Sequence, residues 1–178
     1  MPTYPTLKPF VVHGHNTSFR DEVVDYLTHT LGMLEPIVLD GVASAGRTVI
    51  EKFGEESTKC NIAVVLLTPD DRGTPSTGTR YNTARPNVWI ELGFFFARFG
   101  RRTGRTLLIY RKGLDIPTDI SGVFYIDATA GIADPNVSKR LETELNAVIT
   151  SGIVTPAPVA PHLGGMYAVS GSLHLASH

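Results

Sequence analysis

The sequence predicts an α/β fold with a doubly wound, parallel sheet that carries helices on both faces. Within residues 1–150, short apolar runs alternate five times with amphipathic segments, as in consecutive strand-helix crossover units. The run 61–70, NIAVVLLTPD, is the most continuous stretch of β-branched residues and leucine, which is typical of a central strand buried on both faces. The chain of 178 residues is long enough for one domain with a sizeable core.

The first half of this pattern contains two strand-helix pairs. A strand at 9–12 ends in a tight loop and leads to an amphipathic helix at 17–32, for which Thr17 is the expected N-cap. A second short strand at 35–40 leads through a loop of small residues to a helix at 48–58.

The second half begins with a long polar segment. Residues 70–85 hold hardly an apolar side chain and predict an exposed loop. Pro86 then favours the first turn of a helix over 87–99. The remaining expected elements are a strand at 105–110, a helical turn at 115–122, a strand at 123–127 and a closing helix at 134–149.

Five parallel strands arranged in this way predict the flavodoxin-like order 2-1-3-4-5. In that order the ligand crevice opens at the carboxyl ends of strands one and three, where the strand order reverses. The loops 13–16 and 68–73 therefore flank the expected site.

The charge balance argues against a polyanionic partner. Lys plus Arg number 16, Asp plus Glu number 17, and the isoelectric point is about 6.6, so no global field attracts nucleic acid or anionic lipid. The single cysteine, Cys60, cannot form an internal disulfide. No apolar run approaches the roughly 18 residues of a membrane span, and the first ten residues lack the core of a signal peptide. We therefore expect a cytoplasmic protein.

Residues 151–178 form a tail of different character. No Asp, Glu, Lys or Arg follows Glu144, and the tail is rich in Pro, Gly and Ala. Because disordered tails are usually more charged, two alternatives stand: a flexible extension, or a segment that docks on a neighbour.

Glu91 is the most informative single residue, because it lies inside the apolar segment 87–100. Burying an unpaired carboxylate costs several kcal/mol or forces it to take up a proton. Helical spacing places Asn87 and Glu91 on neighbouring positions in the half of the helix nearest the crevice. The structural alternatives are an ion pair with Arg98 or Arg47, or stabilisation by the helix N-terminus.

The crevice loops supply further candidates. His13 and His15 alternate along the chain, but two histidines without a third ligand at recognisable spacing do not predict a metal site. The functional interpretation is that Gly14 lets the backbone approach a phosphate or ribose while His15 or Asn16 donates hydrogen bonds. Asp70 follows strand three, where turn chemistry is the simpler explanation of two adjacent aspartates.

Arg47 and Trp89 each have two interpretations. Arg47 lies in the loop 41–48, which lacks the lysine of a phosphate loop, and is either an anion contact or a surface charge at a helix start. Trp89 and the aromatic run 94–96 favour packing on the sheet over a stacking platform.

Five segments together resemble the prokaryotic TIR-like family, predicted nucleotide-binding proteins of bacterial antiphage defence systems. The segments are VVHGHN, GRTVIEKFGEES, AVVLLTPDD, NVWIELGFFFARFGR and DIPTDISGVFYID. The resemblance covers residues 8–149 and leaves the tail outside.

This resemblance implies a TIR fold and, for many relatives, cleavage of the bond between nicotinamide and ribose in NAD⁺. It places the catalytic glutamate on Glu91 and implies self-association through TIR-TIR contacts, with a sensor or effector protein of a defence system as a further partner. The loop matched by 41–48 rearranges when such domains assemble, and its assembly candidates are Gly41, Ser44 and Gly46. The candidates for substrate binding are His13, Gly14, His15, Asn16, Arg47, Asp70, Asn87 and Trp89.

One carboxylate is chemically sufficient for this reaction. Ordinary glycosidases need two, because one must protonate a poor leaving group. The nicotinamide of NAD⁺ is already a cationic pyridinium and leaves as a neutral molecule, so Glu91 needs only to bind ribose and stabilise the oxocarbenium-like transition state. No cofactor is then expected, since NAD⁺ is the substrate.

Two other functions remain open at the level of sequence. The domain could be a nucleotide-sensing or scaffold TIR module without turnover, because fold does not settle function. It could also be a nucleoside deoxyribosyltransferase-like enzyme, which would act on free nucleosides and ignore NAD⁺. The sequence does not separate hydrolysis from cyclisation.

Overall fold

The computed structural model describes residues 3–39, 48–76, 78–120 and 122–152. The elements run along the chain in the order β1 Pro9–Val12, α1 Thr17–Asp25, the π-helical turn η1 Tyr26–Thr30, α2 Val49–Ser57, β2 Ile62–Leu67, β3 Asp71–Gly73, β4 Tyr81–Thr83, α3 Pro86–Phe99, β5 Thr106–Tyr110, the 3₁₀ turn η3 Thr118–Ile120, β6 Ile126–Asp127 and α4 Pro135–Thr150.

The main sheet has four parallel strands in the order β1-β2-β5-β6. Every residue of β2 is buried, as predicted for the central strand. On the outer side of β1, Ile37 forms a single parallel bridge with Phe10. The predicted 2-1-3-4-5 order is therefore retained, with strand two, at the edge, reduced to a single bridge.

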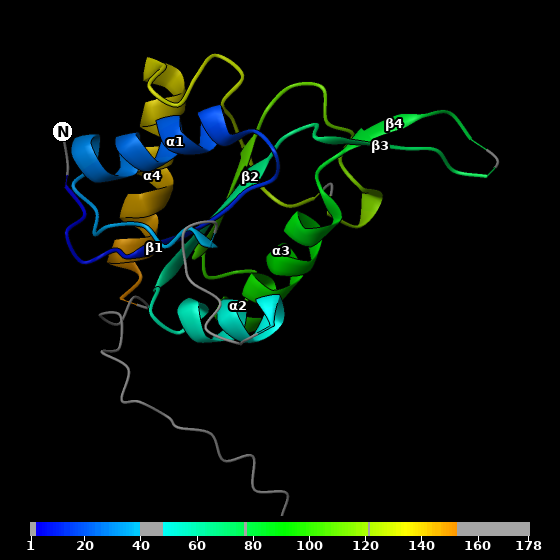
Figure 1. Ribbon diagram of the computed structural model, residues 1–178. Helices are drawn as coiled ribbons and strands as arrows, with labels where there is room; N and C mark the ends of the chain where they lie inside the picture. Colours follow the sequence, from blue (N-terminus) through cyan, green and yellow to red (C-terminus); the bar gives the residue numbers. More distant parts are fainter. Residues whose placement is uncertain (1–2, 40–47, 77, 121, 153–178) are drawn as a thin grey trace, which may run out of the picture.

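Helices cover both faces of the sheet (Figure 1). One face packs against α1 and α4, and the other packs against α2 and α3. Alternate strand residues separate into these two cores, so Val11 and Val64 lie in the first core while Val12 and Val65 lie in the second. This is the two-sided burial expected of a doubly wound sheet.

The strand predicted at 35–40 was wrong as a full element. Ile37 makes two backbone hydrogen bonds with β1, to Pro9 O and from Val11 N, both of 2.9 Å. Further on, the Leu39 carbonyl accepts a hydrogen bond from Lys52 Nζ at 3.0 Å. That carbonyl is thereby bonded to α2 and not to the ladder of β1.

The polar segment 70–85 was predicted to be an exposed loop; most of its described residues are exposed, but the prediction of a loop throughout was wrong. It contains an antiparallel hairpin of β3 and β4, which projects from the sheet (Figure 1). Gly73 pairs with Tyr81, and a Cβ on that glycine would overlap the tyrosine ring. At the base of the hairpin, the Asn82 N–H donates to the Asp115 carboxylate at 2.8 Å. Backbone pairing and one glycine contact thus form a hairpin from residues of polar composition.

Two element boundaries also differ from prediction. The N-cap of α1 is Asn16 and not Thr17, because the Asn16 Oδ1 accepts the Phe19 N–H at 3.0 Å. The strand predicted at 123–127 shortens to the two residues of β6. The predicted helices α3 and α4 are confirmed, with Asp134 as the N-cap of α4.

Within the described ranges, no helix is both long and apolar enough to cross a membrane.

Candidate functional site

Glu91 lies at the border of the buried side of α3. The helix buries one stripe of side chains, namely Val88, Leu92, Phe95 and Phe99. Since successive residues of an α-helix are about 100° apart, Glu91 falls beside this stripe, and its side chain is half-buried. Its position in the first half of α3 brings it near the carboxyl edge of the sheet, because a crossover helix runs antiparallel to the strands it connects.

The flank of α3 that carries Glu91 faces α2. Phe53 of α2 packs edge-on against Phe94 and Phe95, with ring centroids 4.8 and 5.6 Å apart. Glu91 precedes these two phenylalanines by one helical turn. Glu91 therefore lies one helical turn before the contact between α2 and α3, and α2 has its own first turn at Val49. Thr48 fixes this turn by a capping box with Glu51.

The alternative ion pair of Glu91 with Arg98 gains no support from the helix geometry. Seven residues separate the two, which corresponds to about 10 Å along the axis. The Arg98 guanidinium lies over the Phe99 ring, 5.4 Å from its centroid. The other proposed partner, Arg47, lies outside the described residues, as do the assembly candidates Gly41, Ser44 and Gly46.

The structure brings Gly14 and Asp70 together at the carboxyl ends of β1 and β2. A Cβ on Gly14 would overlap the Asp70 carboxylate and lie 2.7 Å from its Cγ, so only glycine fits here without a shift. Thr68 Oγ1 donates a hydrogen bond to Asp70 Oδ2 at 2.9 Å, and Thr68 is buried. The two crevice loops therefore meet at the predicted switch point.

Thr68 is a candidate site residue that sequence reasoning missed. Its hydroxyl orients the carboxylate that packs on Gly14. Its place directly after the most apolar strand was the signal that could have identified it, because polar residues at the carboxyl ends of parallel strands line the crevice.

The histidines and Asn16 of the first loop have different environments. His13 Nδ1 lies 2.8 Å from the Gly14 carbonyl, and because a carbonyl only accepts, this nitrogen must carry the proton. His15 is exposed, while Asn16 caps α1. Among the described residues, no three His, Cys, Asp or Glu side chains gather into a group that would hold a metal ion.

Trp89 lies on the other flank of α3, roughly 160° around the helix from Glu91. Its Nε1 donates to Thr83 Oγ1 at 2.9 Å, and its ring packs against the core between α3 and the sheet. Trp89 thus connects α3 to the hairpin. Asn87 is exposed in the first turn of α3, one turn before Glu91. The structure therefore separates Trp89 from Glu91 and keeps Asn87 close to it.

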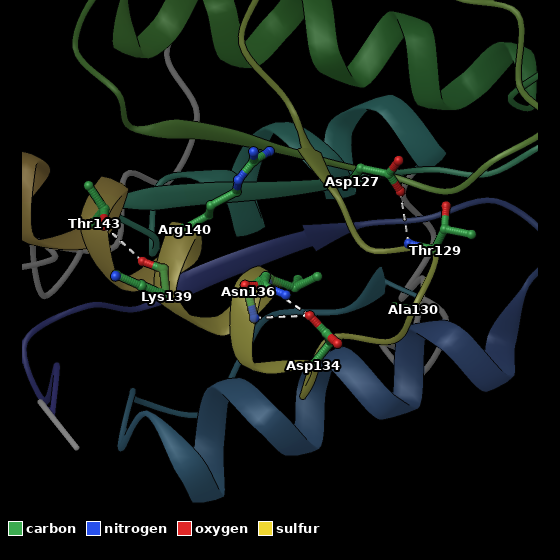
Figure 2. A pocket seen from close by; sticks show the side chains of 9 residues that line it. Asp127, Thr129, Ala130, Asp134, Asn136, Lys139, Arg140 and Thr143 are labelled. Atoms are coloured by element: carbon green, nitrogen blue, oxygen red, sulfur yellow. Dashed lines mark hydrogen bonds between the residues drawn. The ribbon is translucent and has the colours of Figure 1, made fainter.

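A separate open hollow of about 690 Å³ lies at the end of β6 and the first turns of α4 (Figure 2). Its two carboxylates are already engaged. Asp134 caps α4, and Asp127 accepts the Thr129 N–H at 2.9 Å. Hydrogen bonds from Thr129 are the main cause that holds the pKa of Asp127 below its usual range. Neither Glu91 nor Gly14 lines this hollow, so it is distinct from the switch-point site.

Comparison with known proteins gives the family of this site. Residues 8–130 match the family model described as "CAP12/Pycsar effector protein, TIR domain". The chain is 40% identical over 122 residues to the uncharacterized protein YuaY of Escherichia coli (strain K12), which covers 67% of this chain and 39% of YuaY. It is 32% identical over 149 residues to Protein tirC of Dictyostelium discoideum, covering 79% of this chain and 70% of tirC.

A third relative carries the family name itself. The chain is 36% identical over 112 residues to the Pycsar effector protein PaPycTIR of Pseudomonas aeruginosa, covering 62% of this chain and 35% of that protein. The chain thus spans little more than a third of YuaY and of PaPycTIR. The family match extends from the start of β1 through the end of β6 and includes Gly14, Asp70 and Glu91. The chain belongs to the CAP12/Pycsar effector TIR-domain family of bacterial antiphage defence.

Proposed function

We propose that this TIR domain cleaves the bond between nicotinamide and ribose in NAD⁺, with Glu91 as the catalytic residue. The observation that carries the proposal is the position of Glu91. A half-buried carboxylate lies at the border of an apolar helix face, in the half of α3 nearest the carboxyl edge of the sheet and one turn before the contact with α2. A carboxylate that served only solubility would lie on the exposed side of α3, as Ile90 and Ala97 do.

The chemistry that we assign to Glu91 is electrostatic. As the bond to the pyridinium lengthens, positive charge develops on the ribose ring. A fixed carboxylate in a partly desolvated site stabilises that charge more strongly than water does. Nicotinamide leaves as a neutral base, so no general acid is needed, and the ribose hydroxyls supply hydrogen-bond donors to the same carboxylate.

The crevice loops provide the remaining substrate contacts in this proposal. The loop 13–16 approaches the diphosphate or ribose, with His15 exposed for a hydrogen bond. Asn87 lies one turn before Glu91 and supplies a polar group on the same flank. Arg47 would bind the diphosphate. Asn16 caps α1 through its side-chain oxygen and Trp89 bonds to Thr83, so any substrate contact of these two residues would have to use their remaining groups.

The fate of the ribosyl cation defines the product. Capture by water gives ADP-ribose, whereas capture by a second nucleophile of the same NAD⁺ molecule gives a cyclic isomer. Both outcomes release nicotinamide. The proposal covers the shared cleavage step, and the second product identifies the enzyme as hydrolase or cyclase.

A nucleotide-sensing or scaffold module is the second candidate. The observation that favours it is that two residues predicted to bind substrate have other partners. Asn16 accepts a hydrogen bond from Phe19 N, and Trp89 donates one to Thr83 Oγ1. Such a module would bind the nucleotide and release no nicotinamide. The family match supports a TIR domain, so we do not carry the deoxyribosyltransferase alternative forward.

The experiment that tests the proposal is a product-resolved incubation with NAD⁺. The purified chain is incubated with NAD⁺ and, separately, with a free nucleoside, and the products are separated by chromatography. We expect nicotinamide together with ADP-ribose or a cyclic isomer, and no reaction with the nucleoside. Binding of NAD⁺ without nicotinamide release, across a range of protein concentrations, would instead support the sensing module.

A further inference from the structure

A turn rich in arginine lies at the amino edge of the main sheet, opposite the edge that carries the switch-point site. This arginine turn is the segment 98–105, RFGRRTGR, which contains four arginines, and no Asp or Glu occurs in 92–114. It connects the end of α3 to the start of β5. Because β1, β2 and β5 are parallel, Lys8, which directly precedes β1, lies at the same edge. This edge therefore has a local excess of positive charge in a chain whose overall charge is nearly balanced.

The backbone of the arginine turn is well defined. Gly100 and Gly104 have φ angles of 77° and 72°, a conformation that residues with a side chain rarely adopt. Thr103 Oγ1 donates a hydrogen bond to the Gly100 carbonyl at 2.9 Å and accepts one from the Arg105 N–H at 3.3 Å. A surface that is already ordered loses less conformational entropy when a partner binds.

Two of the arginines share one aromatic ring. The Arg105 guanidinium lies 4.1 Å from the centroid of the Phe99 ring, and the Arg98 guanidinium lies 5.4 Å from the same centroid. Arg105 Nε also donates to the Asn61 carbonyl at 2.8 Å. Burial is the main cause that lowers the pKa of Arg105, and the charge of Arg98 lowers it as well. Contacts with the ring thus hold two like charges together although they repel each other.

The positive charge of the turn is not balanced by carboxylates. Arg20 and Lys59, elsewhere in the chain, form ion pairs with Asp21 and Glu56. In the part of the chain that the structure describes, no arginine of the turn forms such a pair. Like charges without counter-charges favour the binding of an anion, because the anion attracts each of them and offsets their repulsion.

An exposed apolar side chain lies beside these charges. Phe124 is 56% exposed and lines the same notch as Arg101, a notch of about 90 Å³. Aromatic residues and arginine are the types enriched at protein interfaces. The Phe99 ring, by contrast, is only 6% exposed, so it offers no free face on which a nucleic-acid base could stack. Arginines next to one exposed phenylalanine therefore fit a protein segment better than a nucleic acid.

We propose that the arginine turn and Phe124 together bind an acidic segment of a partner protein. The carboxylates of that segment accept paired hydrogen bonds from the guanidinium groups, the geometry for which arginine is suited. An apolar side chain of the same segment packs on Phe124. Because this surface lies at the edge of the sheet opposite the one near Glu91, the proposal does not depend on NAD⁺ cleavage.

The test measures the affinity of a fluorescein-labelled peptide that contains several glutamates and one leucine. The variant Arg101→Gln/Arg102→Gln removes two exposed charges of the turn and leaves the two arginines on Phe99 in place. The matched control is Lys139→Gln/Arg140→Gln, which removes two exposed charges from α4. We expect the turn variant to bind the peptide about tenfold more weakly than wild type, with a smaller dependence on salt. The control should bind as wild type does.

Phe124 is tested with a second peptide, in which serine replaces the leucine. Phe124→Ser should weaken binding of the leucine peptide and leave binding of the serine peptide unchanged, because only the first peptide has an apolar side chain to pack on the ring. Equal effects of Phe124→Ser on both peptides would show that Phe124 is not part of the binding surface.

Three other outcomes would overturn the proposal. Equal affinity of wild type and the turn variant for the leucine peptide would mean that the arginines do not bind it. Tighter binding of a single-stranded oligonucleotide of the same net charge, or of a vesicle containing phosphatidylserine, would identify a different class of partner. A wild-type dimer that the turn variant converts to a monomer would mean that a second copy of the chain occupies this surface.

Discussion

At the scale of single residues, the contact between Gly14 and Asp70 determines how the two crevice loops meet. The Asp70 carboxylate occupies the space that a side chain at position 14 would need, and Thr68 holds that carboxylate by a hydrogen bond. Glycine is thus required for close approach and not for a left-handed backbone. A larger residue must displace either the loop or the carboxylate.

This contact predicts the effect of Gly14→Ala. We expect the variant to lose about 1–3 kcal/mol of unfolding free energy, because overpacking forces neighbouring atoms to shift. Urea denaturation measures the loss. In the background of Asp70→Ala, where the carboxylate is absent, the same substitution should cost much less. An equal loss in both backgrounds would show that Gly14 is required for a reason other than the Asp70 carboxylate.

Cys60 gives a prediction on pH at the same scale. The thiol is buried and donates to the Ser57 carbonyl at 3.0 Å, and desolvation by burial raises the pKa of Cys60 from 9.0 to about 11. The neutral thiol is therefore favoured more in the folded state than in the unfolded state. The contribution of the neutral Cys60 thiol to the stability of the folded state is complete below pH 9 and is lost as the pH rises through 11.

The measurement is unfolding free energy against pH for wild type and Cys60→Ala. Wild type should lose stability between pH 9 and 11 more steeply than the variant, since only wild type has a thiol that ionises more readily when unfolded. Parallel curves would contradict the assignment. The buried thiol should also react with a thiol reagent at pH 8 only after unfolding.

At the scale of elements, the sequence predicted best those segments in which local pattern and tertiary packing agree. The helix α3 begins at Pro86 and ends before Gly100, whose φ is 77°. The positions of this proline and this glycine, together with the helical spacing of the apolar residues, predicted these limits. The central strand β2 also follows directly from its apolar composition. These elements needed no information from distant residues.

The errors arose where long-range contacts decide the local structure. The hairpin of β3 and β4 depends on the Gly73–Tyr81 pair and on Asp115, which lies 33 residues from Asn82. The strand predicted at 35–40 is reduced to the bridge of Ile37 with Phe10, and the Leu39 carbonyl accepts a hydrogen bond from Lys52 instead of continuing the ladder. Neither contact leaves a periodic pattern in the sequence. For the site, the meeting of Gly14 with Asp70 followed from topology, whereas the bond of Trp89 to Thr83 did not.

The link between hairpin and helix predicts the behaviour of Trp89→Phe. Loss of the indole donor should cost about 0.5–1.5 kcal/mol, the usual net contribution of such a hydrogen bond. Thr83→Val removes the acceptor, so the double variant should cost less than the sum of the two single changes. Full additivity, measured by denaturant unfolding, would mean that this hydrogen bond does not couple α3 to the hairpin.

At the scale of the whole molecule, the exposed apolar residues of α2 and α3 suggest how activity is controlled. Ile50 is 81% exposed and Ile90 is 70% exposed. Ile50 lies in the first turn of α2, and Ile90 directly precedes Glu91 on α3. Exposed apolar surface next to a site marks a contact surface, and we propose that a second copy completes the site there.

This assembly hypothesis predicts a rate per subunit that increases with protein concentration. Nicotinamide release is measured over a wide range of concentration for wild type and for Ile90→Lys, which should weaken association and lower the rate at intermediate concentrations. The two proteins should reach similar unfolding midpoints, because residue 90 is exposed. A rate strictly proportional to protein concentration would contradict the hypothesis.

Whether one carboxylate, Glu91, stabilises the transition state is decided by the rate of nicotinamide release by Glu91→Gln. The matched control is Glu35→Gln, which makes the same change at an exposed position. We expect a loss of about 10²–10³-fold or more for Glu91→Gln at unchanged fold and NAD⁺ binding, and wild-type turnover for the control. Turnover within a fewfold of wild type for Glu91→Gln would contradict the account.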